Sequence, residues 1–284
     1  MNQSATWEQI TRLIDIYVET IRNELRERWK HWPLDLAKKE MYEAIGALLA
    51  RQVSLATHLA LSPPVWNGHI APLVLRSMTD AYITLAWIFQ DPVARSVKFI
   101  EFGLGQAKLQ LEHRKKQLED DGRVSKDDPL IRGTEDWINE QRLADLTEVH
   151  VGAWAGLDTR KMVEEAGCID LYNYAYSPFS SATHNMWSHI ATHNLERCPN
   201  PLHRYHMIPI DRLISPDIDF VYRAAKYVEK SFKLFEEKTG VRLEGKSAFQ
   251  SLAEALDEMS RKSDQEQYGE ERPKDGSKGN ENST

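Results

Sequence analysis

Hydrophobic residues recur at spacings of three and four along most of the chain, which is the periodicity of amphipathic helices. Proline, glycine or aspartate follows most of these runs and ends them. No segment of useful length alternates apolar and polar residues as a half-buried strand would. We therefore expect an all-α, single-domain bundle of about eight to ten helices. The expected helices cover approximately residues 5–31, 36–61, 73–89, 93–121, 135–146, 159–166, 216–238 and 247–259, with a polar helix inside 172–196.

Composition divides the chain into three parts. Residues 1–34 are interpreted as an N-terminal amphipathic helix, and residues 35–259 as the helical core domain. Residues 260–284 contain too few apolar side chains to bury a core and are expected to be a disordered tail. Within the core, Asp158 is expected to cap the start of one helix, with Gly167 just beyond its end.

The most apolar run, residues 73–89, raises the question of a membrane span. Its seventeen residues are few for a bilayer crossing, and Arg76 and Asp80 interrupt it near the middle. We expect a buried central helix and no membrane contact.

Charge and cysteine content narrow the functional class. A formal charge of −7 argues against a nucleic-acid binder that works through bulk electrostatics, although a local basic patch stays open. Cys168 and Cys198 cannot form the disulfide framework of a secreted scaffold, and their separation does not match a zinc knuckle. The N-terminus lacks the basic start and apolar core of a signal peptide. A reducing, cytoplasmic location is expected.

Arg76 and Asp80 are the first candidates for a functional site. They lie four residues apart and so share one helix face, where charged groups on an apolar helix must find partners. Because a buried ion pair contributes little net stability, the pair hints at a site. The structural alternative is a pair that fixes helix packing, and the sequence leaves both open.

The segment 172–196 concentrates hydroxyl and imidazole groups. Tyr176, Ser180 and His184 follow one another at steps of four, so a helix would align them. Pro178 either kinks that helix or occupies its first turn. A serine beside a histidine is a weak signal of an activated nucleophile, and a hydrogen-bonded histidine with no chemical role is the alternative. Three apolar residues of the segment are expected to be core: Met186, Trp187 and Ile190.

A metal site is the second candidate in this segment. His189, His193 and Glu196 are spaced by four and three, which would place two imidazoles and a carboxylate on one helical face. A solvated polar face is the alternative. His203 and His206, in the proline-rich loop that follows, are either ligands or without a role, and no cofactor is expected.

A third pattern is an arginine followed at short distance by a histidine, as in the metal-independent ribonucleases of the higher-eukaryote and prokaryote nucleotide-binding superfamily. Arg51 and His58 fit this pattern on one helix face. With ten histidines in the chain, chance alone produces about two such matches, so the motif by itself decides nothing.

Three segments together resemble a family of bacterial helical proteins known only as a domain of unknown function. They are RSMTDAYITLAWIFQDP at 76–92, WAGLDTRKMVEEAG at 154–167 and LYNYAYSPFSSATHNMW at 171–187. The family pattern is an arginine-plus-acid helix ending in Asp-Pro, a Trp-Gly-Arg-Ala-Gly-like segment and a Tyr-x3-Ser-x3-His stretch. In this chain the acid is Asp80, where glutamate is more usual.

This resemblance covers roughly residues 35–235 and implies a helical fold with a polar centre. Members of the family resemble components of mobile or defence-associated loci, which implies a nuclease-like effector as one function. The residues that the resemblance assigns to the polar centre are Arg76, Asp80, Tyr176, Ser180 and His184.

Two functional hypotheses follow. In the first, His184 is a general acid or base and Arg76 stabilises a phosphate, as in a ribonuclease or phosphotransfer enzyme. In the second, the same residues form a buried network in a non-catalytic interaction module, whose charged helix 93–121 contacts a partner. The partner is a protein or RNA, and a homo-oligomer stays open. Both hypotheses predict that Arg76 or Asp80 lies within about 6 Å of the 176–184 groups.

Overall fold

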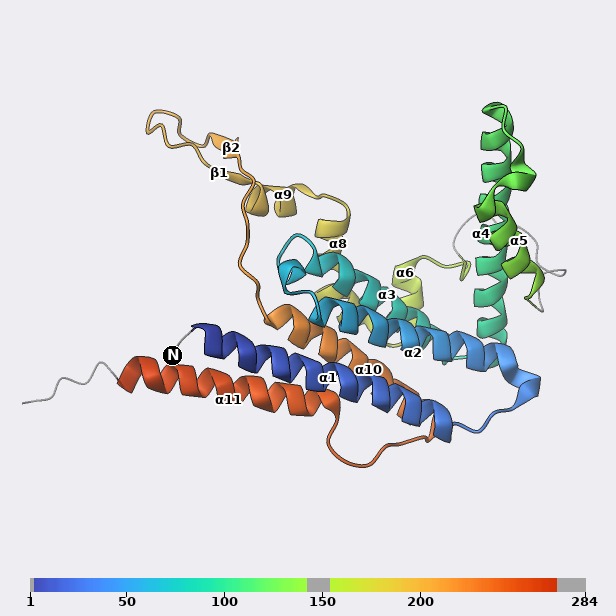
Figure 1. Cartoon of the computed structure of the whole chain (residues 1–284), viewed down its shortest axis with the longest axis horizontal. Helices are drawn as coiled ribbons and strands as arrows, with labels where there is room; N and C mark the ends of the chain where they lie inside the picture. The colour runs from blue at the N-terminus through green and yellow to red at the C-terminus, as the bar shows by residue number, and fades with distance from the viewer. Residues whose placement is uncertain (1–2, 142–153, 270–284) are drawn as a thin grey trace, which may run out of the picture.

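Long helices packed side by side make up the body of the molecule (Figure 1). The computed structural model describes residues 3–141 and 154–269. Helix α2 packs against α1, α3 and α10, and helix α11 packs against α1 and α10. The bounds of the five body helices are α1 Gln3–His31, α2 Lys39–Ala60, α3 Ala71–Ile88, α10 Asp219–Thr239 and α11 Ala248–Gly269.

Helix α3 lies at the centre of this body, as its all-round apolar character predicts. Leu75, Ile83 and Ile88, which point to different sides of the helix, are fully buried. An ion pair ties α1 to α10 nearby, because Arg28 Nη2 lies 2.6 Å from Glu236 Oε1 and its guanidinium covers the Phe232 ring at 4.1 Å. Polar side chains therefore supplement the apolar core between helices.

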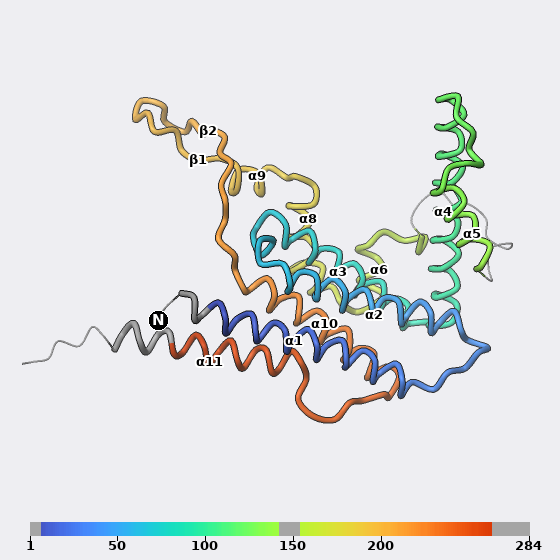
Figure 2. The backbone as a smooth tube through the Cα atoms, viewed as in Figure 1, coloured from blue at the N-terminus to red at the C-terminus, as the bar shows by residue number. Residues whose placement is uncertain are grey.

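Two projections extend from opposite ends of the body (Figures 1 and 2). One is a hairpin of two helices, α4 (Pro92–Asp120) and α5 (Pro129–Asn139), which has a small apolar core of its own. The other is an antiparallel pair of strands, β1 (Leu195–Arg197) and β2 (Met207–Pro209).

Short helical pieces connect the two projections and pass across α3. They are α6 (Thr159–Glu165), α7 (Ile169–Leu171), a π-helical turn (Tyr172–Tyr176), α8 (Ser177–Thr183) and α9 (Trp187–His193). Both α8 and the π-helical turn contact α3. Three single-turn 3-10 helices complete the described structure: Leu36–Lys38, Pro63–Val65 and Ser125–Asp127.

Local signals set several of the helix ends where the sequence placed them. The Asp158 carboxylate accepts a hydrogen bond from the Lys161 amide at 2.8 Å, so the predicted N-cap of α6 is confirmed. Gly167, with φ +67°, lies just past the end of that helix. Gly240, with φ +76°, ends α10 in the left-handed conformation that glycine tolerates best.

Other boundaries differ from those expected. Helix α5 begins at Pro129 rather than near 135, because Asp128 caps it by accepting from the amides of Leu130 and Ile131. Helix α11 continues through Gly269, beyond the expected end near 259. The expected end of α5 near 146 and the tail from 270 onward lie outside the described residues.

The all-α prediction is confirmed, and the two short strands are an unexpected addition to it within the described residues. Each strand has three residues, which is too short to display an alternating pattern. Their pairing sets Leu195 opposite Pro209 and Arg197 opposite Met207. Tertiary pairing, not local periodicity, makes this hairpin.

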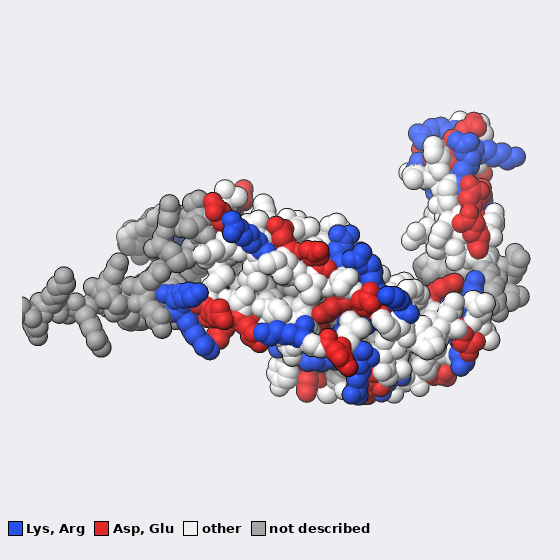
Figure 3. Space-filling model, turned by 60° about the horizontal axis from the view of Figure 1, so that its bottom comes forward, with Lys and Arg blue, Asp and Glu red and all other residues white. Residues whose placement is uncertain are grey.

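The structure shows how charge is distributed over one face of the molecule and how apolar its helices are. Basic and acidic side chains are interspersed over the face drawn in Figure 3, and no broad patch of one sign covers it. Among the described helices, none combines the length and the apolar content needed to cross a bilayer.

Candidate functional site

Arg76 is the centre of the predicted polar cluster, and α3 holds it against the π-helical turn and α8. Its Nε donates a hydrogen bond to Ser180 Oγ at 3.0 Å. Its guanidinium carbon lies 3.2 Å from the centroid of the Tyr176 ring, in a cation–π contact. The predicted contact between the two polar clusters is therefore confirmed.

Asp80 completes the cluster one helical turn after Arg76. Its carboxylate accepts a hydrogen bond from Arg76 Nη1. The Asp80 side chain is 49% exposed, whereas that of Arg76 is 11% exposed. The acid thus lies at the rim of the cluster and screens the arginine from solvent.

The π-helical turn is the local feature that brings Tyr176 over Arg76. Insertions of this kind in helices are rare and are frequent at functional sites. Tyr172 stacks on Tyr176 with ring centroids 4.8 Å apart, and the Tyr176 hydroxyl donates to Thr159 Oγ1 at 3.3 Å. Ser180 Oγ in turn donates to the Tyr176 carbonyl at 2.8 Å. Each member of the cluster is therefore held by a neighbour.

His184, the predicted acid or base, lies outside this cluster. It is the C-terminal cap residue of α8, and its side chain is exposed. The helix breaks immediately afterwards, where Asn185 takes φ +50°. The break also turns two residues outward that were expected to be core: Met186 is 50% exposed and Trp187 71%. That expectation is wrong, because no helix packs over this corner in the described structure.

Histidines gather instead at α9, where sequence analysis predicted a metal site. The rings of His189 and His193 have centroids 4.5 Å apart, and His69 joins them at 5.2 Å from His193. Burial, followed by the neighbouring imidazoles, lowers the pKa of His189 and of His193. These rings are therefore biased toward the neutral form that binds metals.

Glu196, the third predicted ligand, does not share the helical face of the two histidines. Helix α9 ends at His193, and Glu196 lies on β1, where its carboxylate pairs with Arg212 at 3.5 Å. Within the described residues, the group whose ligand atoms come within 4.8 Å of one another is a different one, formed by Cys198, His203 and His206.

A cavity of about 340 Å³ lies beside the α6–α7 connection, between α3 and α10. Its lining includes Cys168 and Lys230. Burial raises the pKa of the Cys168 thiol, and this effect outweighs the opposite influence of Lys230. A nucleophilic cysteine needs a lowered pKa, so this cavity lacks an activated thiol.

Sequence reasoning missed Thr159 and His69. Nothing in the sequence around Thr159 signals a contact with Tyr176, since seventeen residues separate them. His69 lies in the turn just before the most apolar helix, and only the return of α9 to that turn brings the imidazoles together. Gly68 permits the approach, because a Cβ there would lie 2.6 Å from His193 Cε1.

Comparison with known proteins identifies the family of this chain. No curated protein and no solved structure matches the chain. The model of a family of unknown function, DUF5677, matches residues 42–200, which is more than half of the chain. The match spans α3, the π-helical turn and α8, and so includes the whole Arg76 cluster. The chain therefore belongs to the family of unknown function DUF5677.

Proposed function

We propose that this protein is a non-catalytic interaction module that assembles with a second copy of itself through the α4–α5 hairpin. The observation that carries the proposal is that the polar cluster and the open apolar groove lie in different parts of the molecule. The Arg76 cluster is closed by its own side chains, while the open apolar groove lies elsewhere, on a projecting hairpin.

The closed cluster supports a structural role for Arg76. Two of its nitrogen atoms donate to Ser180 and Asp80, and the Tyr176 ring covers its face. A phosphate-binding arginine needs donors directed at a ligand. A general acid or base must also reach the reacting group, and the His184 side chain is exposed and makes no hydrogen bond or ion pair with Arg76 or Asp80 among the described residues.

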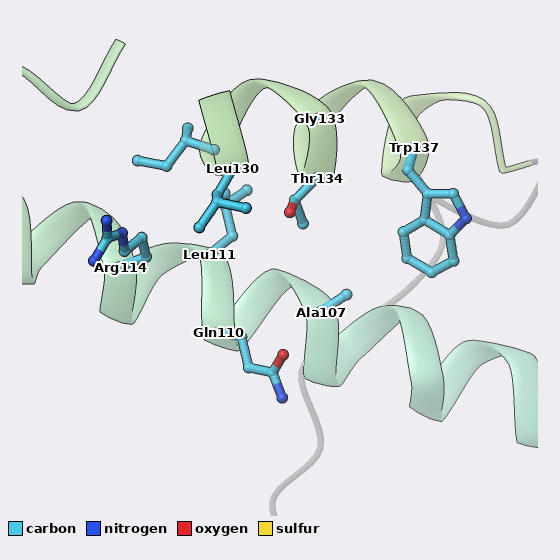
Figure 4. Close-up of a pocket in the computed structure, with 9 residues that line it drawn as sticks. Ala107, Gln110, Leu111, Arg114, Leu130, Gly133, Thr134 and Trp137 are labelled. Atoms are coloured by element: carbon cyan, nitrogen blue, oxygen red, sulfur yellow. The ribbon is translucent and has the colours of Figure 1, made fainter. Parts of the chain in front are cut away.

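The hairpin groove supports the interaction role. A cavity of about 480 Å³ lies between α4 and α5, and Figure 4 shows side chains of both helices lining it. Buried contacts between the two helices are few, and this small core consists of Leu111, Leu118, Ile131 and Ile138. Two helices alone form half of a four-helix bundle, so their apolar faces gain from a further pair of helices.

The side chains of α5 that line the groove favour a second copy of the chain as that further pair of helices. Leu130, Gly133 and Trp137 lie at helical spacing along the groove, and Leu130 is 70% exposed. A two-fold axis through the middle of this stripe would set Leu130 against Trp137 of the second copy, and the reverse contact would follow by symmetry. Gly133 would lie at the crossing, where a Cβ would meet nothing within 4 Å.

Two measurements on the purified full chain test the proposal. Light scattering over a concentration series should give a dimer for the wild type, and Leu130→Asp should weaken association about tenfold or more, because it places a charge in the apolar contact. Leu202→Asp is the matched control, since Leu202 is 87% exposed on the other projection. In parallel, RNA incubated with wild type or His184→Ala should stay intact.

Each measurement has a contradicting outcome. A wild type that stays monomeric at every concentration, or a Leu202→Asp variant as defective as Leu130→Asp, would overturn assembly through the hairpin. Cleavage of RNA by the wild type that His184→Ala abolishes would overturn the non-catalytic role and favour the ribonuclease hypothesis.

A further inference from the structure

The tip of the β1–β2 hairpin carries three side chains of metal-ligating type. Cys198 follows β1, His206 precedes β2, and His203 lies in the loop between them. The Cys198 amide donates to the His206 carbonyl at 3.0 Å, so the strand pairing continues to these two residues. The backbone thus sets two of the three side chains directly across the hairpin.

One distance within this group matches that of a metal site, and the others are about 1 Å longer at most. Cys198 Sγ lies 3.6 Å from His203 Nδ1, and the ligand atoms of all three residues lie within 4.8 Å of one another. In tetrahedral zinc sites the metal–sulfur and metal–nitrogen bonds are about 2.3 and 2.1 Å, which separates the sulfur and nitrogen atoms by about 3.6 Å. The first pair therefore already has the spacing that a shared ion requires. The remaining approach, of about 1 Å, is within reach of a side-chain rotation of His206.

A second contact orients the His203 ring. The Asn200 side-chain nitrogen lies 3.1 Å from His203 Nε2, and the Asn200 side-chain oxygen accepts from the Leu202 amide at 3.0 Å. Because an amide nitrogen only donates, Nε2 accepts in this contact, and Nδ1, which faces Cys198 Sγ, carries the ring proton in the metal-free chain. Metal binding at Nδ1 would move this proton to Nε2 and turn the Asn200 side chain, so that its oxygen accepts from Nε2 as outer contacts of metal-bound histidines do.

The hairpin has little apolar packing of its own. Its strands have three residues each, and an isolated two-stranded hairpin is marginal in water. The large side chains at its tip are solvent-exposed, with Leu202 at 87% and Tyr205 at 99%. Tyr205 also has φ +63°, a conformation that side chains disfavour. A cross-link at the tip would supply the order that an apolar core does not.

We infer that Cys198, His203 and His206 bind one divalent transition-metal ion, of which zinc fits best. One thiolate and two imidazoles are soft and borderline ligands, which favour zinc over magnesium or calcium. Binding releases the thiol proton, so affinity falls as the pH is lowered. Three protein ligands leave the fourth tetrahedral position to water.

Cobalt titration of the metal-free full chain tests this site, because a cobalt–thiolate bond has a charge-transfer absorption that imidazole ligands alone do not produce. The wild type should develop the band with one equivalent of Co²⁺ and lose it when Zn²⁺ is added. Cys198→Ser should abolish the band, and His206→Ala should weaken binding by about tenfold or more. Zinc should also raise the Tm of the wild type, because the ion binds only the folded hairpin.

Two variants serve as matched controls. Cys168→Ser removes the other cysteine of the chain, and His193→Ala removes a histidine of the α9 cluster. Both should keep the band and the affinity. A wild type that gives no band in excess Co²⁺, or a band that Cys168→Ser removes and Cys198→Ser leaves, would overturn the site. Circular dichroism of Cys198→Ser, expected to equal that of the wild type, separates loss of metal from loss of fold.

Discussion

Removal of the Arg76 side chain should destabilise the protein by about 3 kcal/mol. The hydrogen bond from a charged donor to Ser180 contributes about 1.5–3 kcal/mol and the cation–π contact with Tyr176 about 0.5–2 kcal/mol. The pair with half-exposed Asp80 adds at most about 1 kcal/mol. These contributions share one side chain and do not simply add, so we expect a total in the lower half of their summed range of about 2–6 kcal/mol.

Neither partner becomes a buried orphan after the change, which keeps the loss moderate. Ser180 Oγ retains its hydrogen bond to the Tyr176 carbonyl, and Asp80 reaches solvent. For a domain of this size, about 3 kcal/mol corresponds to a drop in Tm of about 6–12 °C. Urea and thermal unfolding of Arg76→Ala, followed by circular dichroism, measure the loss.

Companion variants separate this cluster from the general effect of losing an arginine. Arg51→Ala on the exposed face of α2 should change stability by less than about 0.5 kcal/mol. Asp80→Asn should cost about 1 kcal/mol or less, because its carboxylate is half exposed. Arg76→Lys should recover little, since an ammonium lacks the planar fork that stacks on Tyr176 and reaches two acceptors. The reasoning is refuted if Arg76→Ala costs less than about 1 kcal/mol or no more than Asp80→Asn.

Two further predictions concern pH and packing. Because burial and neighbouring imidazoles lower the pKa of His189 and His193, the unfolded chain takes up protons before the folded one does as the pH falls below about 6.5. The free energy of unfolding should therefore drop from about pH 6.5 downward and be unaffected by these two histidines above it. In the presence of a chelator, replacing both histidines by asparagine should reduce the fall in Tm between about pH 7.5 and 5.5. An unchanged fall in Tm would contradict the assignment. Gly46→Ala should lower the free energy of unfolding by about 1 kcal/mol net, because the new Cβ would lie 2.8 Å from Trp29 Cη2. Gly103→Ala should raise it by about 0.5–1 kcal/mol, because alanine favours the helix and its Cβ would meet nothing within 4 Å. Denaturant unfolding measures both, and equal effects would show that the Trp29 ring moves aside freely.

Helices and their ends were readable from the sequence because the causes are local. Apolar residues at helical spacing predicted the body helices, and Asp158 and Gly240 acted as the cap and stop that their chemistry favours. The contact between α3 and the 176–180 segment was also predictable, because a charge on the most apolar helix has to find polar partners. Arg76 found them in Ser180 and Tyr176.

Only the tertiary structure decided which imidazoles and thiols come together. The sequence spacing placed His184 with Ser180 and Glu196 with His193. The helical conformation is interrupted at Asn185, however, and helix α9 ends at His193. Each helix end changes the direction of every later side chain, and the hydrophobic periodicity of the sequence does not show at which residue a helix ends.

The histidine and cysteine groups that the structure shows depend on contacts that span the chain. His69 meets His193 because α9 returns to the turn before α3, and Cys198 meets His206 because two three-residue strands pair across a loop. Pairing between distant segments is set by the packing of the whole chain, which no local window of sequence contains. The helices of this protein are therefore a property of its sequence pattern, and its candidate sites are a property of its fold.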